Sequence, residues 1–306
     1  MPAKRNYLLL YAKGLAMGAA DVVPGVSGGT IAFISGIYEE LVNSIRSVNV
    51  GAVRCLFREG SGAFWNRING TFLAVLAAGI VTSVFTLARG VSVALDQYPL
   101  LLWSFFFGLI AASIFYVVRQ QQHWRPREWL GLGGGTAVAV LTALSPPLVL
   151  EPTAPTVFFA GMLAICAMIL PGISGSFILL LIGMYPVLID ALTGFDLARL
   201  GLFGAGAAVG LMAFANVLSW LLDHHHSTTL SVLTGFLAGS LLTVWPWKIG
   251  GGTSVAPELL LPGTYADRVA DPRMLECLAA LVAGLLLVLA LEYLGAKGRS
   301  ASGRSI

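Results

Sequence analysis

The chain has 306 residues, of which 57% are hydrophobic and only 11% are charged, whereas a soluble domain carries about 25% charged residues. This composition excludes an ordinary soluble protein and predicts an all-α polytopic membrane protein. The net charge of +3 gives no reason to expect binding to nucleic acid. The three cysteines, Cys55, Cys166 and Cys277, are scattered, so we expect no metal site, disulfide framework or cofactor.

The first segment of interest covers residues 14–46 and contains a Pro-Gly pair inside apolar sequence. Its signature reads Pro-Gly-Val-Ser-Gly-Gly from Pro24 to Gly29. Proline removes a backbone donor and disfavours helix in the residue before it. The freed backbone groups cannot face hydrocarbon. The segment is therefore either a re-entrant helical hairpin or a broken helix that crosses the membrane.

Apolar runs follow this segment, each close to the roughly 20 residues that a transmembrane helix needs. In the first half they are 72–95, 100–118 and 130–150. The second half has the same order, with the signature Pro-Gly-Ile-Ser-Gly-Ser from Pro171 to Ser176 in a segment at 157–193. Its apolar runs are 200–222, 230–247 and 275–294. We therefore predict one structural domain built from two repeats, residues 1–150 and 151–306.

Direct comparison of the two halves supports the repeat. A shift of 147 residues aligns the signatures with eight identities between residues 21 and 43, including Ser27 with Ser174. A shift of 127 residues aligns the runs that follow, for instance Gly79 with Gly206. The difference of 20 residues is an insertion in the basic loop at about residues 46–69. Ungapped matches at two fixed shifts indicate an internal duplication.

Positive charges decide between the two interpretations of the signature segments. With two re-entrant hairpins and a cytoplasmic N-terminus, thirteen Lys and Arg residues fall inside and four outside, as the positive-inside rule requires. Crossing segments would instead place the basic N-terminus and the basic cluster at 46–67 on opposite sides. Each repeat thus has one re-entrant hairpin and three transmembrane helices, and both termini are expected in the cytoplasm. Three crossings invert the second repeat, an arrangement typical of alternating-access transporters.

The two signatures are candidate phosphate sites. A helix that starts inside the membrane presents N–H groups that suit an anion, and small residues let a ligand approach the backbone. The alternative is that these residues only permit a sharp turn and close helix packing. Duplication at equivalent positions favours binding. The candidate residues are Pro24, Gly25, Ser27, Gly28, Gly29 and Thr30 in the first signature, and Pro171, Gly172, Ser174, Gly175 and Ser176 in the second.

Arg89 is the strongest candidate outside the signatures. A charge within a membrane span is a functional hypothesis by default, and arginine suits phosphate. Arg89 lies about six residues, or roughly 9 Å of helix rise, from the outer end of its span. The alternative is that its side chain snorkels to the interface. Its repeat mate, Asn216, is also polar.

Asn216 and three other residues, Asp21, Tyr38 and Tyr185, are candidates for ion coupling or support. Asp21 precedes the first signature and has Met168 as its repeat mate. It carries a coupling proton, or else caps a helix or balances an arginine. Tyr38 and its mate Tyr185 support the site or pack as interfacial aromatic residues. The Asp-His-His-His run at 223–226 cannot converge well on a metal and is expected in a cytoplasmic loop.

The segment Gly-Leu-Ala-Met-Gly-Ala-Ala-Asp-Val-Val-Pro-Gly-Val-Ser-Gly-Gly-Thr, from Gly14 to Thr30, and its echo from Leu170 to Ser176 resemble the bacterial polyprenyl-phosphate transporter family. That family was formerly described as a domain of unknown function, and the resemblance covers essentially the whole chain. It implies translocation of undecaprenyl phosphate from the outer to the inner leaflet of the bacterial cytoplasmic membrane. This lipid carrier is thereby recycled for peptidoglycan and other envelope synthesis. The resemblance also implies contact with membrane lipids and a coupling ion, proton or sodium.

Two other functions fit parts of the pattern. A secondary transporter or channel for a small anion would use the same inverted repeats and broken helices. An enzyme similar to undecaprenyl-pyrophosphate phosphatases would share the Pro-Gly-x-Ser motif, but that motif continues into arginine where this chain has Gly175. None of the four histidines lies within a predicted hairpin. Phosphoryl chemistry without a general acid, an arginine clamp or a metal is hard to stabilise, so a transporter is favoured over an enzyme.

Overall fold

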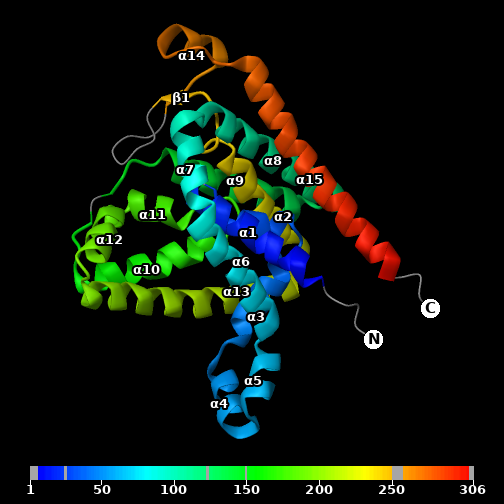
Figure 1. Cartoon of the computed structure of the whole chain (residues 1–306), viewed down its shortest axis with the longest axis vertical. Coiled ribbons are helices and arrows are strands. Elements are labelled where there is room, and N and C mark those ends of the chain that lie inside the picture. The colour runs from blue at the N-terminus through cyan, green and yellow to red at the C-terminus, as the bar shows by residue number, and fades with distance from the viewer. Residues whose placement is uncertain (1–5, 24–25, 122–123, 149, 250–257, 303–306) are drawn as a thin grey trace.

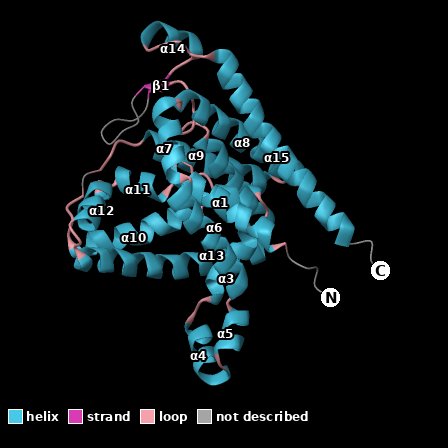
Figure 2. Cartoon of the chain, viewed as in Figure 1, coloured by secondary structure: helices cyan, strands magenta, loops and turns pink. Residues whose placement is uncertain are grey.

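The computed structural model describes residues 6–23, 26–121, 124–148, 150–249 and 258–302, so Pro24 and Gly25 lie outside the described residues. Within these ranges the chain forms fifteen helices and one antiparallel sheet of two short strands (Figure 2). The expected helical membrane protein is confirmed at this level. The small sheet, which pairs Lys248 with Leu259, is a departure from the purely α-helical expectation.

The elements of the first half follow one another as α1 (Tyr7–Val22), α2 (Gly28–Ile34), α3 (Tyr38–Ser47), α4 (Val50–Glu59), α5 (Ser61–Arg67), α6 (Gly70–Thr86), α7 (Ala88–Gln97), α8 (Pro99–Gln120) and α9 (Pro126–Leu144). Those of the second half are α10 (Ala154–Ile169), α11 (Gly175–Leu181), α12 (Met184–Thr193), α13 (Leu197–Ser240), β1 (Lys248–Ile249), β2 (Glu258–Leu259), α14 (Pro262–Arg268) and α15 (Met274–Ser302). Each half therefore opens with a long helix, a seven-residue helix and a ten-residue helix.

The insertion at 46–69 is mostly helical, so its prediction as a loop was wrong. α4 begins after Asn49, whose side chain accepts a hydrogen bond from the Ala52 amide at 3.1 Å. It ends at Gly60, whose φ of +91° suits glycine. α5 then bends by 71° into α6. The charge pattern identified a side of the membrane, but it carried no information on backbone conformation.

Several apolar runs differ in extent from the sequence prediction. The run at 72–95 is divided at Leu87 into α6 and α7. α9 ends at Leu144 because the Ser-Pro-Pro sequence that follows cannot continue a helix. The run at 230–247 is helical only as far as Ser240 and continues in turns.

α13 combines two helices that meet at His225, where the backbone (φ −134°, ψ 42°) is not helical. Its first part (197–224) and second part (226–240) occupy the places of two predicted spans. Among the described residues, α8 and α13 are long and apolar enough to cross a membrane. The bent pairs α5–α6 and α11–α12 would raise the number to four if each pair forms one span. α10 and the first part of α15 are shorter apolar helices.

Glycines bring helices together within each half. α1 lies along α6, and α10 lies along the first part of α13. A Cβ on Gly14 or Gly79 would overlap the backbone of the other helix in the first pair. Gly161 and Gly206, their mates under the shifts of 147 and 127, make the equivalent contact in the second pair. Small residues allow this close approach where lipid supplies no hydrophobic drive between helices.

Two further helix pairs join the halves to each other. α8 lies along α15, and α9 lies along the second part of α13. Gly108 and Gly284 meet the opposing backbone in the first of these pairs, as Gly135 and Gly235 do in the second. In each of these pairs, one helix comes from the first half and the other from the second. Figure 1 shows the result, with α4 and α5 at one end of the molecule and α14 at the opposite end.

The tips of the two signature segments bind each other. The Ser27 hydroxyl donates to the Met168 carbonyl at 2.9 Å, and the Gly172 amide donates to the Thr30 hydroxyl at 2.9 Å. Ser27 and Thr30 are buried, and Gly29 packs against the backbone of Ile169. Backbone groups freed by one break in apolar surroundings therefore find partners in the other segment.

The tip contact can be tested by Thr30→Val. This change leaves the partly buried Gly172 amide without its acceptor, so we expect the free energy of unfolding to fall by about 1–3 kcal/mol. Thermal denaturation in detergent measures the effect. The control is Thr86→Val, because that hydroxyl is exposed and donates within α6 to the Thr82 carbonyl. Equal losses in the two variants would contradict a special role for the tip.

Glycine packing can be tested in a single helix. Gly206→Ala places a methyl group into the Phe158 backbone, so we expect a loss of about 1–3 kcal/mol from overpacking. Gly204→Ala, two residues away, meets open space and is expected to be neutral or slightly stabilising, because alanine favours helix over glycine. Melting temperatures of the two purified variants give the comparison. A melting temperature of Gly206→Ala at or above that of Gly204→Ala would be evidence against this packing.

Candidate functional site

The first signature is closed by bonds within the protein. The Gly28 amide donates to Asp21 Oδ1 at 2.6 Å, and the Gly29 amide donates to the Ser27 hydroxyl at 3.1 Å. Ser27 therefore acts as the N-cap of α2. Asp21 caps the same helix start, which was one of its predicted roles. The N–H groups predicted to face an anion are engaged here by side chains of the chain itself.

The second signature forms a tighter turn. Gly172 has φ +85° and packs against the Phe236 backbone, so a larger residue there would be strained as well as crowded. The Ser174 and Ser176 hydroxyls lie 2.9 Å apart and share a hydrogen bond. Pro171 and Gly175 are buried. Of the predicted signature residues, the structure therefore brings Ser27, Gly29 and Thr30 of the first segment to Gly172 and the end of α10 in the second.

Arg89 and Asn216 lie elsewhere. Arg89 is exposed near the start of α7, and no hydrogen bond or ion pair among the described residues joins it to a signature. Asn216 is also exposed, and its amide donates to the Met212 carbonyl of its own helix at 2.8 Å. The assignment of Arg89 to the phosphate site and that of Asn216 to coupling or support stay predictions.

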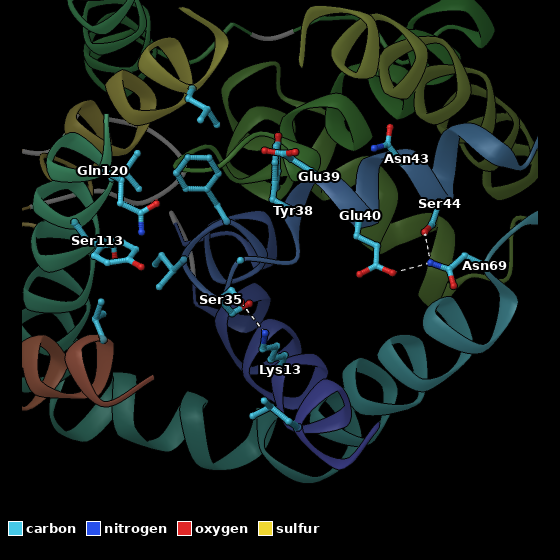
Figure 3. A pocket seen from close by; sticks show the side chains of 18 of the residues that line it. Lys13, Ser35, Tyr38, Glu39, Glu40, Asn43, Ser44, Asn69, Ser113 and Gln120 are labelled. Carbon is cyan, nitrogen blue, oxygen red and sulfur yellow. Dashed lines mark hydrogen bonds between the residues drawn. The ribbon is translucent and has the colours of Figure 1, made fainter. Parts of the chain in front are cut away.

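A pocket of about 790 Å³ lies beside the first hairpin (Figure 3). One wall is polar and comes from α1, α3 and the turn before α6. The opposite wall comes from α8, α13 and α15 and is mixed, because α8 contributes Ser113, Tyr116 and Gln120 beside Val117. The lining residues include Lys13, Tyr38, Glu39, Glu40, Asn43, Ser44, Arg67 and Asn69 on the polar wall, and Leu230 and Val288 on the opposite wall.

Polar side chains of the pocket are organised by hydrogen bonds. Lys13 Nζ donates to the Ser35 carbonyl at 2.6 Å, linking α1 to the end of α2. The Asn69 amide donates to Glu40 Oε1 at 2.8 Å and to the Ser44 hydroxyl at 3.1 Å (Figure 3). Asn69 adopts a left-handed backbone, with φ +53°, at the start of α6. That conformation turns the chain between α5 and α6, and the side-chain amide of Asn69 reaches α3 from this turn.

Tyr38 is one of the most buried residues of this wall. It is only 3% exposed, and among the described residues its hydroxyl has no hydrogen-bond partner. Its ring packs edge-on against Phe33, with the centroids 5.4 Å apart. Tyr185, its repeat mate, belongs to a separate apolar cluster in the second half.

Hydrogen bonds and ion pairs join α3 to α13. Arg46 donates to the Ser219 hydroxyl at 2.7 Å and pairs with Asp223 at 3.2 Å. His226 Nε2 lies 2.8 Å from Glu39 Oε1. The histidine run was predicted in a loop, and this was wrong, because it continues α13 through the kink at His225. Among the described residues no group of three His, Cys, Asp or Glu side chains could hold a metal ion.

Sequence reasoning missed the polar wall of the pocket. Lys13 was noticeable as a charge in an apolar segment, and its repeat mate is Ala160. Glu40 and Ser44 likewise have Val187 and Ala191 as mates. These differences between repeat mates are the sequence signal for the polar wall. The identities that define the repeat do not include these positions.

The equivalent place in the second half is nearly closed. Its cavity measures about 10 Å³ and is lined by the mates of the polar residues, Ala160, Val187 and Ala191, together with Arg199 and Phe203. Related positions thus surround a wide pocket in one half and almost no space in the other.

Comparisons with known proteins agree with this membrane architecture. The sequence profile of the VCA0040-like, undecaprenyl phosphate translocase-like family matches residues 17–257. A polyprenyl-phosphate transporter of Vibrio cholerae is 45% identical over 297 residues, which cover 94% of this chain and 96% of the relative. A polyprenyl-phosphate transporter of Staphylococcus aureus is 31% identical over 259 residues, covering 76% and 84%. No solved structure matches.

The profile covers more than half of the chain, and both relatives are named as transporters. The resemblance seen in the signatures is therefore confirmed, and the alternative of a phosphatase-like enzyme is not supported. The chain belongs to the undecaprenyl phosphate translocase-like family and is a membrane transporter rather than an enzyme.

Proposed function

We propose that this transporter moves undecaprenyl phosphate from the outer to the inner leaflet of the bacterial cytoplasmic membrane, in exchange for or together with a proton or sodium ion. The substrate class is supported by the names of the two relatives. The observation that carries the mechanism is the pair of equivalent cavities, about 790 Å³ beside the first hairpin and about 10 Å³ beside the second. Unequal volumes at equivalent places are expected of a carrier that opens to one side of the membrane at a time.

Helix directions support the inverted relation of the two repeats. Gln121, at the end of α8, bonds to Ser231 near the start of the second part of α13 at 3.1 Å. Lys248, just beyond the end of that helix, lies 3.7 Å from the ring centroid of Trp103 near the start of α8. The two helices therefore run antiparallel, although the shift of 127 residues makes them repeat mates. Antiparallel mates are expected only if one repeat is inverted.

Lys248 lies on the face opposite the pocket. Its ammonium donates to the Thr243 carbonyl and stands over Trp103. Burial lowers the pKa of Lys248 to about 8, because the charged form loses hydration. We place this face outside and the wide pocket on the cytoplasmic side, since the pocket lies among the basic segments that the positive-inside rule puts in the cytoplasm. Both termini are then cytoplasmic.

The signatures take part in the exchange between the two states of this carrier. In the present conformation the Gly28 amide and the Ser27 and Thr30 hydroxyls are bound within the protein. A phosphate reaches these groups only after the tip bonds have opened. We therefore propose that the signatures contact the headgroup in transit, with Asp21 holding the place of the anion at other times.

Leaflet-resolved transport in proteoliposomes tests the proposal. Purified protein is reconstituted with a polyprenyl phosphate whose exposure in each leaflet is reported by a soluble reagent. We expect protein-dependent movement that responds to an imposed pH or sodium gradient. Entrapped inorganic phosphate is followed in parallel, since a small anion is the alternative cargo.

The outcomes separate the two cargoes. Movement of the lipid without release of inorganic phosphate supports the proposal. Release of phosphate without lipid movement would assign the protein to small anions, and absence of lipid movement under every gradient would refute the flippase function.

A further inference from the structure

We propose that α4 and α5 lie on the cytoplasmic surface of the bilayer, where an apolar stripe of α4 enters the lipid and Arg54 and Arg58 bind the phosphates of anionic lipid headgroups. These two helices make up most of the insertion at 46–69, which has no counterpart in the second half. The proposal uses the orientation of the chain given above. It does not depend on the cargo, because the lipids concerned are those of the surrounding membrane.

α4 exposes a line of apolar side chains. Val50, Val53 and Phe57 are 79%, 48% and 83% exposed. Their spacing of three and then four residues places them on one face of the helix. The opposite face packs inward, since Ala52 and Cys55 are buried. Contiguous exposed apolar side chains mark a surface that contacts a protein or a membrane.

Basic side chains border this stripe and favour an anionic membrane. Arg54 and Arg58 directly follow Val53 and Phe57, so they lie along one side of the stripe. Both are exposed, and among the described residues neither pairs with a carboxylate. Glu59, the acidic residue of α4, points away from the stripe. A helix of this kind lies in the membrane surface, with its arginines on headgroup phosphates and its apolar side chains at the acyl boundary.

The connection to α6 places α4 at the level of the headgroups. α5 and α6 together are long and apolar enough to cross the membrane as one bent span. The Trp65 ring of α5 packs on Gly70, and its indole nitrogen donates to the Thr71 hydroxyl at 3.0 Å. Tryptophan at the end of a span is typical of the membrane–water interface. α4 packs against α5, and Figure 1 shows both helices at one end of the molecule.

Quenching by labelled lipids tests whether the stripe enters the bilayer. In the full chain without its three cysteines, Phe57→Cys and Glu59→Cys each carry a small uncharged fluorophore. The protein is placed in nanodiscs of phosphatidylcholine and phosphatidylglycerol, one of which bears a nitroxide near the top of its acyl chain. We expect lipid to quench position 57 strongly and aqueous iodide to quench it weakly. Position 59 is the control, exposed on the same helix but away from the stripe, and the reverse is expected there.

The choice of labelled lipid tests the arginines. At equal mole fractions, labelled phosphatidylglycerol is expected to quench position 57 more strongly than labelled phosphatidylcholine. Arg54→Gln combined with Arg58→Gln is expected to remove this preference, each charge accounting for about a fivefold enrichment of the anionic lipid. The control is Arg268→Gln, which removes an exposed arginine of α14 at the opposite end of the molecule. It is expected to leave the preference unchanged.

The outcomes separate this surface from other occupants and from the transport function. Equal lipid quenching at positions 57 and 59, or equal quenching by the two lipids while both arginines are present, would overturn the proposal. Protection from iodide that grows with the number of chains per nanodisc, without lipid quenching, would assign the stripe to a second copy of the chain. Transport is measured separately. Lipid movement without the preference rejects the surface alone, and the preference without lipid movement rejects the function alone.

Discussion

The structure depends on one constraint, that a backbone broken inside the membrane must find its hydrogen-bond partners within the protein. Both signatures break their helices. Ser27 donates to the Met168 carbonyl and Thr30 accepts from the Gly172 amide, so side chains of the first signature satisfy backbone groups at the second break. At the first break, the Gly28 and Gly29 amides donate to side chains of the same segment. The tip contact explains why the two segments meet deep in the molecule. It also explains how two short helices, too brief to be stable alone, keep a fixed position.

Close helix contacts at glycines also hold the two halves together. The same glycine pairing recurs within each half, and two further glycine contacts exchange helices between the halves. Close helix contacts transmit small shifts as rigid-body movements rather than as local deformation. A tip contact made of a few hydrogen bonds is the weaker element of this design. The helix pairs joined by glycines are thus expected to move as units about the tips while the glycine contacts persist.

The sequence was sufficient for the helical membrane class, the two signatures and the family, because composition and the Pro-Gly spacing carry that information directly. It failed for α4 and α5, where charge indicated a membrane side but not a backbone conformation. It also failed for the run at 223–226, where two helices meet at a kink in place of the expected loop. The pocket was beyond prediction for another reason. Its polar wall joins Lys13, Tyr38 and Asn69 from separate elements, and only the fold brings these residues together.

The central claim is that equivalent cavities open in turn, and paired thiol labelling tests it most directly. Ser44 and Ala191 are small repeat mates, one lining the wide pocket and the other the closed cavity. In a background without Cys55, Cys166 and Cys277, Ser44→Cys and Ala191→Cys are each treated with a membrane-permeable thiol reagent, with and without polyprenyl phosphate and an ion gradient. The account predicts opposite changes, in which conditions that slow the reaction at position 44 speed it at position 191. Changes of the same sign, or no reaction at position 191 while transport proceeds, would contradict it.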